Sequence, residues 1–265
     1  MKKPITFYKY HGAGNDFIII DSSDLGDQRV EASQVALWCK RRYGIGADGL
    51  MVFKQTSSET ADFEMSYFNA DGSSGMMCGN GGRCIARFAF DLKGISKSMT
   101  FRLKSTLYKA RVEEDGQVAL ELHPVSEILN NDDTSCYCHT GSPHHVEWVT
   151  TPLHEVAVYE QGKKMRNRYN KDGCNVNFVE VLGANHLAIR TYERGVEDET
   201  HACGTGITAA AISAHKTGRV QGKQVKVTAV GGDLEVRFQV NNGVYEGITL
   251  IGPAQFVFKG TLQWP

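Results

Sequence analysis

Alternating apolar and polar positions predict a strand near residue 65. Residues 63–67 alternate Phe, Met and Tyr with polar neighbours, which is typical of a strand with one buried face. A polar turn follows at 69–72, and then the tetrapeptide Cys-Gly-Asn-Gly at 78–81. Apolar residues over 85–92 then recur at helical spacing, and Gly94 is a typical helix stop. The pattern predicts a strand, a turn and a helix that begins at a cysteine.

The same order of parts returns in the second half of the chain. Residues 187–191 alternate in a shorter strand pattern, and the polar loop 193–200 follows. The tetrapeptide Cys-Gly-Thr-Gly at 203–206 leads into the strongly helix-permissive run 207–215, and Gly218 ends it. The two cysteines lie 125 positions apart (203 minus 78), close to half the chain. Two such units indicate two similar halves.

Short strand-like runs separated by turns surround these two units. They are Phe17–Asp21, Leu50–Phe53, Val118–Leu122, Val156–Tyr159, Val225–Ala229, Leu234–Val240 and Gln255–Lys259. The pattern therefore predicts an α+β fold with two pseudo-symmetric β-rich lobes, each holding one helix that begins at a cysteine.

Composition and charge exclude several classes of partner. The 265 residues are 41% hydrophobic and 22% charged, which is ordinary globular composition with room for one large domain or two smaller ones. The formal net charge is −1, whereas nucleic-acid and membrane-surface binders favour a basic excess. No apolar run is long enough for a transmembrane helix. We expect no nucleic-acid partner and no membrane partner.

Cysteine usage favours reduced thiols. The chain has seven cysteines, an odd number, and it is too large to need disulfide staples. The pair Cys136 and Cys138 is separated by one residue, which is not a zinc-ligand spacing. We therefore expect a cytoplasmic protein without a metal site.

A cysteine at a helix start is a chemically special position. The first N–H groups of a helix have no internal partner, and the helix dipole is positive there. A thiolate at that point is stabilised, so its pKa falls below the free value of about 8.5. Neighbouring glycines let the N–H groups approach a carboxylate closely. A lone cysteine in this position is usually just a small, semi-buried residue, but Cys78 and Cys203 in matching contexts favour a shared function.

Two such helix starts facing one ligand suit the inversion of a carbon next to a carboxylate. Removal of a Cα–H becomes feasible when preorganised donors stabilise the charge that spreads into the carboxylate. Inversion then needs a base on one face and an acid on the other. Two cysteines that share one proton meet this need, because two facing thiolates would repel each other.

Two other motifs do not carry chemistry. The run Gly44–Gly49 matches G-x-G-x-x-G, but it follows the helix-like run Val35–Tyr43 and precedes a strand, the reverse of a dinucleotide site. We interpret it as a connecting turn. A redox dithiol is also disfavoured, because Cys78 and Cys84 are six residues apart and point to different helix faces.

Longer motifs resemble one known family. The chain carries His-Gly-Ala-Gly-Asn-Asp-Phe at 11–17, Phe-Asn-Ala-Asp-Gly at 68–72, Met-Cys-Gly-Asn-Gly-Gly-Arg-Cys at 77–84, and Glu-Arg-Gly at 193–195 leading to Ala-Cys-Gly-Thr-Gly at 202–206. In this order they look like the diaminopimelate epimerases, and the resemblance extends through residue 260. It implies interconversion of LL- and meso-diaminopimelate for lysine and peptidoglycan synthesis, with no cofactor and no metal.

The resemblance also implies an architecture. It predicts one lobe over 1–123, joined by the returning C-terminal strand 253–265, and a second lobe over 124–252. Each lobe wraps around a central helix, the active site lies in the cleft between them, and homodimers are common.

The resemblance assigns roles by position. Cys78 and Cys203 match the catalytic pair. Gly79, Asn80, Gly204 and Thr205 would bind the carboxylate at the reacting centre, helped by Asn15. Asn69, Asn175, Glu193 and Arg194 would bind the far end of the substrate, which is not inverted. His144 is a possible catalytic helper, and a packing role is as good an interpretation of it. Many members have asparagine where this chain has Ser142, so a hydroxyl replaces an amide.

Two alternatives remain open at this stage. One is another cofactor-independent racemase on the same scaffold, acting on proline, hydroxyproline or histidine. The pair Glu193 and Arg194 argues against it, because a ring substrate lacks a second zwitterionic end. The other is a binding protein that captures an amino acid between two helix starts. A binder would not exchange the substrate Cα–H with solvent.

Overall fold

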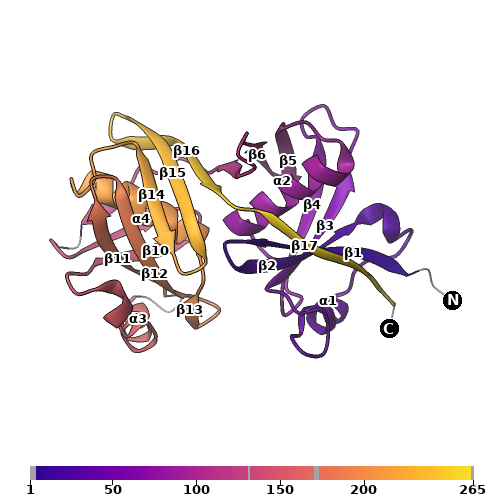
Figure 1. The fold of residues 1–265 in the computed structure, drawn as a ribbon, viewed down its shortest axis with the longest axis horizontal. Helices are drawn as coiled ribbons and strands as arrows, with labels where there is room; N and C mark the ends of the chain where they lie inside the picture. Colours follow the sequence, from indigo (N-terminus) through magenta and orange to yellow (C-terminus); the bar gives the residue numbers. More distant parts are fainter. Residues whose placement is uncertain (1–3, 131, 170–172, 264–265) are drawn as a thin grey trace. The chain divides into compact units, whose positions relative to one another are not determined.

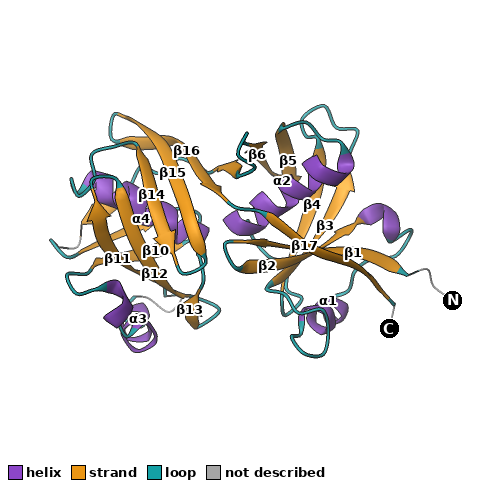
Figure 2. Cartoon of the chain, viewed as in Figure 1, coloured by secondary structure: helices purple, strands orange, loops and turns teal. Residues whose placement is uncertain are grey.

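The chain is a mixed α and β protein rich in strands, as predicted (Figures 1 and 2). The computed structural model describes residues 4–130, 132–169 and 173–263. The chain divides into two compact units, residues 1–120 with 253–265, and residues 121–252. Within the described ranges, no helix has the length and apolar character needed to cross a membrane.

The first unit is a sheet with strand order β17-β1-β2-β3-β4-β5-β6-β7. Its elements are β1 (Ile5–Gly12), β2 (Asn15–Asp21), η1 (Ser22–Asp24), α1 (Ala32–Cys39), β3 (Gly49–Gln55), β4 (Phe63–Asn69), α2 (Gly79–Lys93), β5 (Ser98–Leu103), β6 (Thr106–Val112), β7 (Val118–Glu121) and β17 (Gln255–Leu262). The predicted strand over 63–67 is β4, and the three apolar residues of its alternation are buried.

Helix α2 is the core element of this unit. It packs against β1, β2, β3, β6 and β17, and Figure 2 shows it among the strands of this unit. Ile85, Phe88 and Ala89 are fully buried, as their helical spacing predicts, whereas Leu92 at the end of the same run is 47% exposed. The helix ends at Gly94, which has φ 69° and takes the left-handed conformation that favours glycine.

The second unit has strand order β8-β9-β10-β11-β12-β14-β15-β16, with β13 paired to one end of β12. Its elements are β8 (Ile128–Asn130), β9 (Ser135–His139), β10 (Pro143–Trp148), η2 (Leu153–Glu155), α3 (Val158–Arg166), β11 (Asn175–Gly183), β12 (His186–Glu193), β13 (Asp198–Thr200), α4 (Gly204–Lys216), β14 (Gln224–Ala229), β15 (Gly232–Asn241) and β16 (Val244–Gly252). Helix α4 packs against the strands from β9 to β12 and from β14 to β16.

The internal repeat extends to the pairing of seven strands in each unit. Along β1 to β7 the successive pairs are antiparallel, parallel, antiparallel, parallel, antiparallel and antiparallel. Along β9, β10, β11, β12, β14, β15 and β16 the series is the same. Helices α2 and α4 occupy the same place in each series, after the fourth strand. The two cysteine-led helices are therefore equivalent elements of two equivalent units.

The outer strand of each sheet also follows one rule. Strand β8 comes after β7 of the first unit but pairs with β9 of the second. Strand β17 comes after β16 of the second unit but pairs antiparallel with β1 of the first (Figure 1). In each unit, one edge strand is therefore the segment that directly follows the last strand of the other unit in the sequence.

Two predicted elements are wrong in detail. The run Val156–Tyr159 is not a strand, because helix α3 begins at Val158. Glutamate, glutamine, lysine and methionine follow it, and these strong helix formers outweigh two β-branched residues. The helix predicted over 35–43 ends at Cys39. The motif Gly44–Gly49 leads from α1 into β3, so its interpretation as a connecting turn is confirmed.

Candidate active site

Both cysteines are the residues that cap the start of a central helix. Cys78 has φ −102° and ψ 122° before α2, and Cys203 has φ −107° and ψ 108° before α4. The first helical hydrogen bonds run from Gly82 N to Cys78 O at 2.8 Å and from Ile207 N to Cys203 O at 2.9 Å. Each sulfur is therefore carried at the positive end of a helix, next to N–H groups without helical partners.

Asn15 and Asn80 lie at the Cys78 thiol. Cys78 Sγ–H donates to Asn15 Oδ1 at 3.5 Å, and Asn80 Nδ2 donates to the same oxygen at 3.2 Å. Asn15 Nδ2 donates in turn to Asp48 Oδ2 at 2.6 Å. Gly79 is the first residue of α2, and its carbonyl accepts from Arg83. The structure thus brings Asn15, Gly79 and Asn80 to Cys78.

Asn69 stands apart from this group in its described contacts. It is exposed at the end of β4, and its Nδ2 donates to Ser73 Oγ at 3.0 Å. Its backbone closes the polar turn, with Gly72 N donating to Asn69 O at 2.9 Å. Its role toward a substrate remains a prediction.

Thr205 is the polar neighbour of the second cysteine. Its Oγ1 lies 3.5 Å from Cys203 Sγ, 3.1 Å from Ser142 Oγ and 2.9 Å from His144 Nε2. Cys203 itself is only 8% exposed, and Gly204 after it is buried in the first turn of α4. A hydroxyl is thereby fixed within reach of the sulfur.

His144 is a fully buried neutral imidazole. Asn177 Nδ2 donates to His145 O at 2.8 Å and to His144 Nδ1 at 3.1 Å, while Asn177 Oδ1 accepts from Thr191 at 3.0 Å. This network assigns the ring proton to Nε2, which faces the hydroxyls of Ser142 and Thr205, both at 2.9 Å. Burial lowers the pKa of His144 to about 3. The ring therefore acts as a hydrogen-bond donor toward Thr205 at neutral pH.

Asn175 connects this network to the loop after β12. Its Nδ2 donates to Ser142 Oγ at 3.2 Å and to Pro143 O at 3.0 Å, and its Oδ1 accepts from the backbone N–H of Arg194 at 3.0 Å. Glu193 Oε2 accepts from Thr200 Oγ1 at 2.8 Å. Four predicted site residues of this unit, Asn175, Arg194, His144 and Thr205, thus belong to one hydrogen-bonded cluster.

The sequence analysis missed several residues of these networks, among them Asp48, Arg83 and Asn177. Asn177 and Asn175 face the same side of β11, and two amides among the apolar residues of a strand indicate buried polar groups that need partners. Arg83 lies inside the helical run that follows Cys78, where its burial is not evident from periodicity. Asp48 lies in the connecting turn Gly44–Gly49, where no local pattern marks its carboxylate as the partner of Asn15.

The other five thiols differ in environment from the predicted pair. Burial raises the pKa of Cys39, Cys138 and Cys174 to about 12, and it also raises the pKa of Cys84 and Cys136. Thiols of this kind are protonated and shielded at neutral pH.

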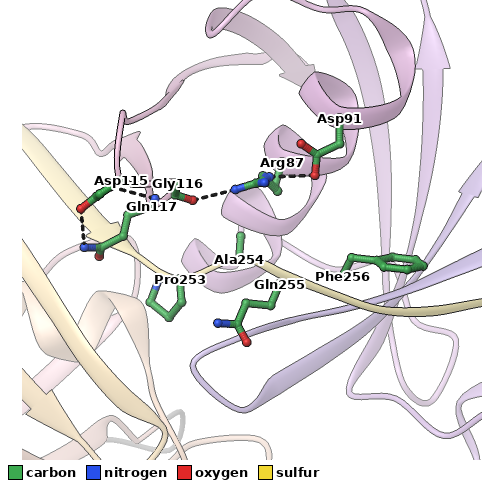
Figure 3. A pocket seen from close by; sticks show the side chains of 9 residues that line it. All are labelled: Arg87, Asp91, Asp115, Gly116, Gln117, Pro253, Ala254, Gln255 and Phe256. Carbon is green, nitrogen blue, oxygen red and sulfur yellow. Dashed lines mark hydrogen bonds and ion pairs between the residues drawn. The ribbon is translucent and has the colours of Figure 1, made fainter.

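A hollow on the first unit lies away from these groups. It is bounded by α2, the turn between β6 and β7, and the start of β17 (Figure 3). Arg87 Nε bonds Asp91 at 2.7 Å and its Nη1 bonds the carbonyl of Gly116 at 2.8 Å, as Figure 3 shows. These bonds tie the turn to the helix, so the polar groups there serve as a structural brace.

Comparison with known sequences identifies the family. A sequence model described as diaminopimelate epimerase matches residues 7–127 and 136–257. A protein of Flavobacterium psychrophilum named diaminopimelate epimerase is 41% identical over 257 residues, which cover 96% of this chain and 99% of that protein. One of the same name from Chlorobaculum tepidum is 43% identical over 262 residues, covering 95% of this chain and 98% of that protein.

Solved structures share the fold at low identity. A PhzF-family phenazine biosynthesis protein of Bacillus anthracis has a TM-score of 0.71 at 16% identity, covering 99% of this chain and 100% of that one. A hydroxyproline epimerase of Agrobacterium vitis has a TM-score of 0.69 at 14% identity, covering 98% and 93%. These likenesses concern the fold alone. The sequence matches go further, and the chain belongs to the diaminopimelate epimerase family.

Proposed function

We propose that this enzyme interconverts LL- and meso-diaminopimelate by moving a proton at one Cα between Cys78 and Cys203. The family to which the chain belongs supports the reaction: it is an isomerase that epimerises diaminopimelate. The single observation that carries the proposed chemistry is the equivalence of the two thiols. Each caps the central helix of one of two units with the same strand topology.

The proposed step is a balanced exchange of protons. The thiolate of one cysteine removes the Cα–H and becomes a thiol, and the electron pair left on carbon spreads into the carboxylate. The thiol of the other cysteine gives its proton to the opposite face and becomes a thiolate. The reverse reaction uses the same groups with exchanged roles, so neither direction consumes a cofactor.

The helix starts supply the donors for the charged carboxylate. The first N–H groups of α2, at Gly79 and Asn80, and of α4, at Gly204 and Thr205, have no helical acceptor. N–H groups fixed in advance lower the barrier most where charge develops, because they need no reorganisation during the reaction. We therefore assign carboxylate binding to these four residues and to the amide of Asn15.

His144 acts in this proposal as a positioning residue. Its neutral ring donates from Nε2 to the Thr205 hydroxyl, which leaves the Thr205 proton available for Cys203 Sγ at 3.5 Å. An O–H donor stabilises a thiolate more than a thiol. The network thus favours Cys203 as a base, and His144 itself moves no proton.

Recognition of the far end is assigned to Asn69, Asn175, Glu193 and Arg194. A guanidinium binds a distal carboxylate with two parallel hydrogen bonds, and a carboxylate and amides accept from a distal ammonium. The alternative hypothesis, a racemase that acts on proline, hydroxyproline or histidine, is not favoured, because the chain belongs to the diaminopimelate epimerase family.

The test is epimerisation by single variants. We expect Cys78→Ala and Cys203→Ala each to abolish formation of meso-diaminopimelate from the LL isomer, measured by chiral chromatography. Cys84→Ala is the matched control, because Cys84 is a fully buried thiol of the same helix α2. Near wild-type epimerisation by either of the first two variants would contradict the two-thiol proposal.

We also propose that the enzyme is a homodimer in the cytoplasm and supplies lysine and peptidoglycan synthesis. The cytoplasmic assignment rests on the chemistry, which needs two reduced thiols. The dimer is supported by strand β17, where Phe256, Val257 and Phe258 are 51%, 50% and 44% exposed in succession. We expect Val257→Glu to convert a dimer into a monomer in sedimentation experiments. A wild-type enzyme that sediments as a monomer would contradict this assignment.

A further inference from the structure

Arg83 is a buried cation with neutral hydrogen-bond partners. Its side chain is fully buried. Nη2 donates to Asn80 Oδ1 at 2.9 Å, Nη1 to the carbonyl of Gly79 at 3.3 Å, and Nε to the carbonyl of Pro253 at 3.5 Å. Burial lowers the pKa of Arg83 to about 10, so the guanidinium stays charged at neutral pH. Burying a charge against neutral dipoles is costly, and rule-breaking features of this kind cluster at functional sites.

The guanidinium fixes the orientation of two amides in series. Arg83 only donates, so Asn80 must present Oδ1 to it and Nδ2 to Asn15. At the other end, the Asp48 carboxylate only accepts, so Asn15 must present Nδ2 to it at 2.6 Å. Asn15 Oδ1 is thereby held toward the Cys78 sulfur at 3.5 Å. Because a cation lies at one end and an anion at the other, each of the two amides has a single orientation in which all of these hydrogen bonds form.

We propose that Arg83 is a positioning residue that holds Asn15 beside Cys78 through Asn80 and favours the Cys78 thiolate by its charge. The fixed Asn15 oxygen accepts the proton of the thiol form. The guanidinium offsets the negative charge that appears on the sulfur when that proton leaves. The second helix start is built differently, with the neutral His144 and Thr205 beside its sulfur. The two thiols are thus stabilised by different means, a buried cation for Cys78 and a hydroxyl for Cys203.

The role of Arg83 in catalysis rests on the proposed function. Its effect on the alkylation rate of Cys78 does not, and that rate is what the test measures. Iodoacetamide alkylation of the wild-type enzyme at pH 7, followed by peptide mass spectrometry, gives the rates at Cys78 and Cys203 in the same molecule. Cys203 serves as the internal reference. Loss of epimerase activity does not enter this measurement, so it stays decisive even if the proposed reaction is wrong.

Variants at the two ends of the hydrogen-bonded chain from Arg83 to Asp48 should change the Cys78 rate in opposite directions, because one removes a cation and the other an anion. Arg83→Met removes the cation and should slow alkylation of Cys78 by about tenfold or more, with the Cys203 rate unchanged. Asp48→Asn removes the anion beside Asn15 and with it the repulsion that a Cys78 thiolate meets there, so it should raise the Cys78 rate by about threefold or more. Arg83→Lys keeps the charge and should recover part of the rate lost in Arg83→Met.

Arg87→Met is the matched control, because Arg87 lies one turn further along α2 and bonds Asp91 and Gly116 rather than Asn80. It should leave both thiol rates unchanged. An unchanged Cys78 rate in Arg83→Met with a native circular dichroism spectrum would overturn the proposal. If Arg83→Met does not fold, Asp48→Asn decides alone, since the Asp48 side chain is 43% exposed and asparagine keeps its size. An unchanged or slower Cys78 rate in Asp48→Asn would also overturn the proposal.

Discussion

Gly206, the third residue of α4, offers the sharpest structural test of the Cys203 site. A Cβ at this position would lie 2.3 Å from Asn177 Oδ1 and 3.3 Å from His144 Cε1. Asn177 is fully buried and holds His144 Nδ1, the His145 carbonyl and Thr191. In Gly206→Ala the amide must move, and the bond from Thr191 is the first to be lost.

The expected cost follows from these contacts. Overpacking of a buried site costs about 1–3 kcal/mol, and a buried polar group left without its partner costs about 1–3 kcal/mol. Alanine has a higher helix propensity than glycine, and this stabilises the folded state by about 1 kcal/mol. We therefore expect Gly206→Ala to lower the free energy of unfolding by roughly 1–5 kcal/mol in equilibrium urea denaturation. Its kcat should also fall, because the ring of His144 positions Thr205.

The internal repeat supplies the control. Gly81 is the third residue of α2 and the equivalent of Gly206, but a Cβ there meets Met51 Sδ at 3.4 Å and Phe17 at 3.5 Å, which are ordinary contacts. Gly81→Ala should change the free energy of unfolding by less than about 1 kcal/mol. Equal losses in both variants, or a Gly206→Ala enzyme as stable as wild type, would refute the reasoning.

Three further predictions concern specificity, thiol reactivity and pH. Arg194→Lys keeps the charge but loses the planar fork, so kcat/KM for diaminopimelate should fall at least about tenfold, and unchanged steady-state kinetics would move Arg194 out of the site. Mild alkylation at pH 7 should modify only Cys78 and Cys203, because burial keeps the other thiols protonated; mass spectrometry that finds early labelling elsewhere would contradict this. Asp16 is partly buried, which alone would raise its pKa, yet bonds from Arg41 and Lys9 hold that pKa at about 2. A carboxyl whose pKa is lowered by folding stabilises the folded state when the pH is above the pKa that the group has in the unfolded chain. This stabilisation is lost as the pH falls from about 5 to 2. The stability gap between wild type and Asp16→Asn, on the order of 2 kcal/mol at pH 7, should shrink over that range, and a constant gap would argue against the ion pair.

Local sequence patterns predicted most of the helices, strands and the internal repeat. The helix starts at Cys78 and Cys203 were predictable because glycines and a helical run follow each cysteine, and the repeat was visible as two copies of one order of parts. Val156–Tyr159 was misassigned because a short apolar run reads as strand or helix alike. Only the residues after it, which extend the helix to Arg166, decide the matter.

The polar networks were less predictable than the cysteines. A thiol next to a helix start is a local feature, whereas the partners of Arg83 and Asn177 come from other elements of the tertiary structure. Periodicity predicts that a position is buried but not which polar group meets it there. The resemblance to the family predicted Asn15, Asn80 and Thr205 at the helix starts, where the structure also places them.

The central claim is that two thiols exchange the Cα proton of diaminopimelate with solvent. The most direct measurement incubates the enzyme with LL-diaminopimelate in deuterium oxide and follows the isomers and their label by mass spectrometry. Thiol protons exchange with water, so each inverted carbon should carry deuterium delivered by the second cysteine. The account predicts meso-diaminopimelate with one deuterium at the inverted centre from the wild type, and none from Cys78→Ala or Cys203→Ala. Meso product that retains the original hydrogen, or labelled meso product from either variant at the wild-type rate, would contradict it.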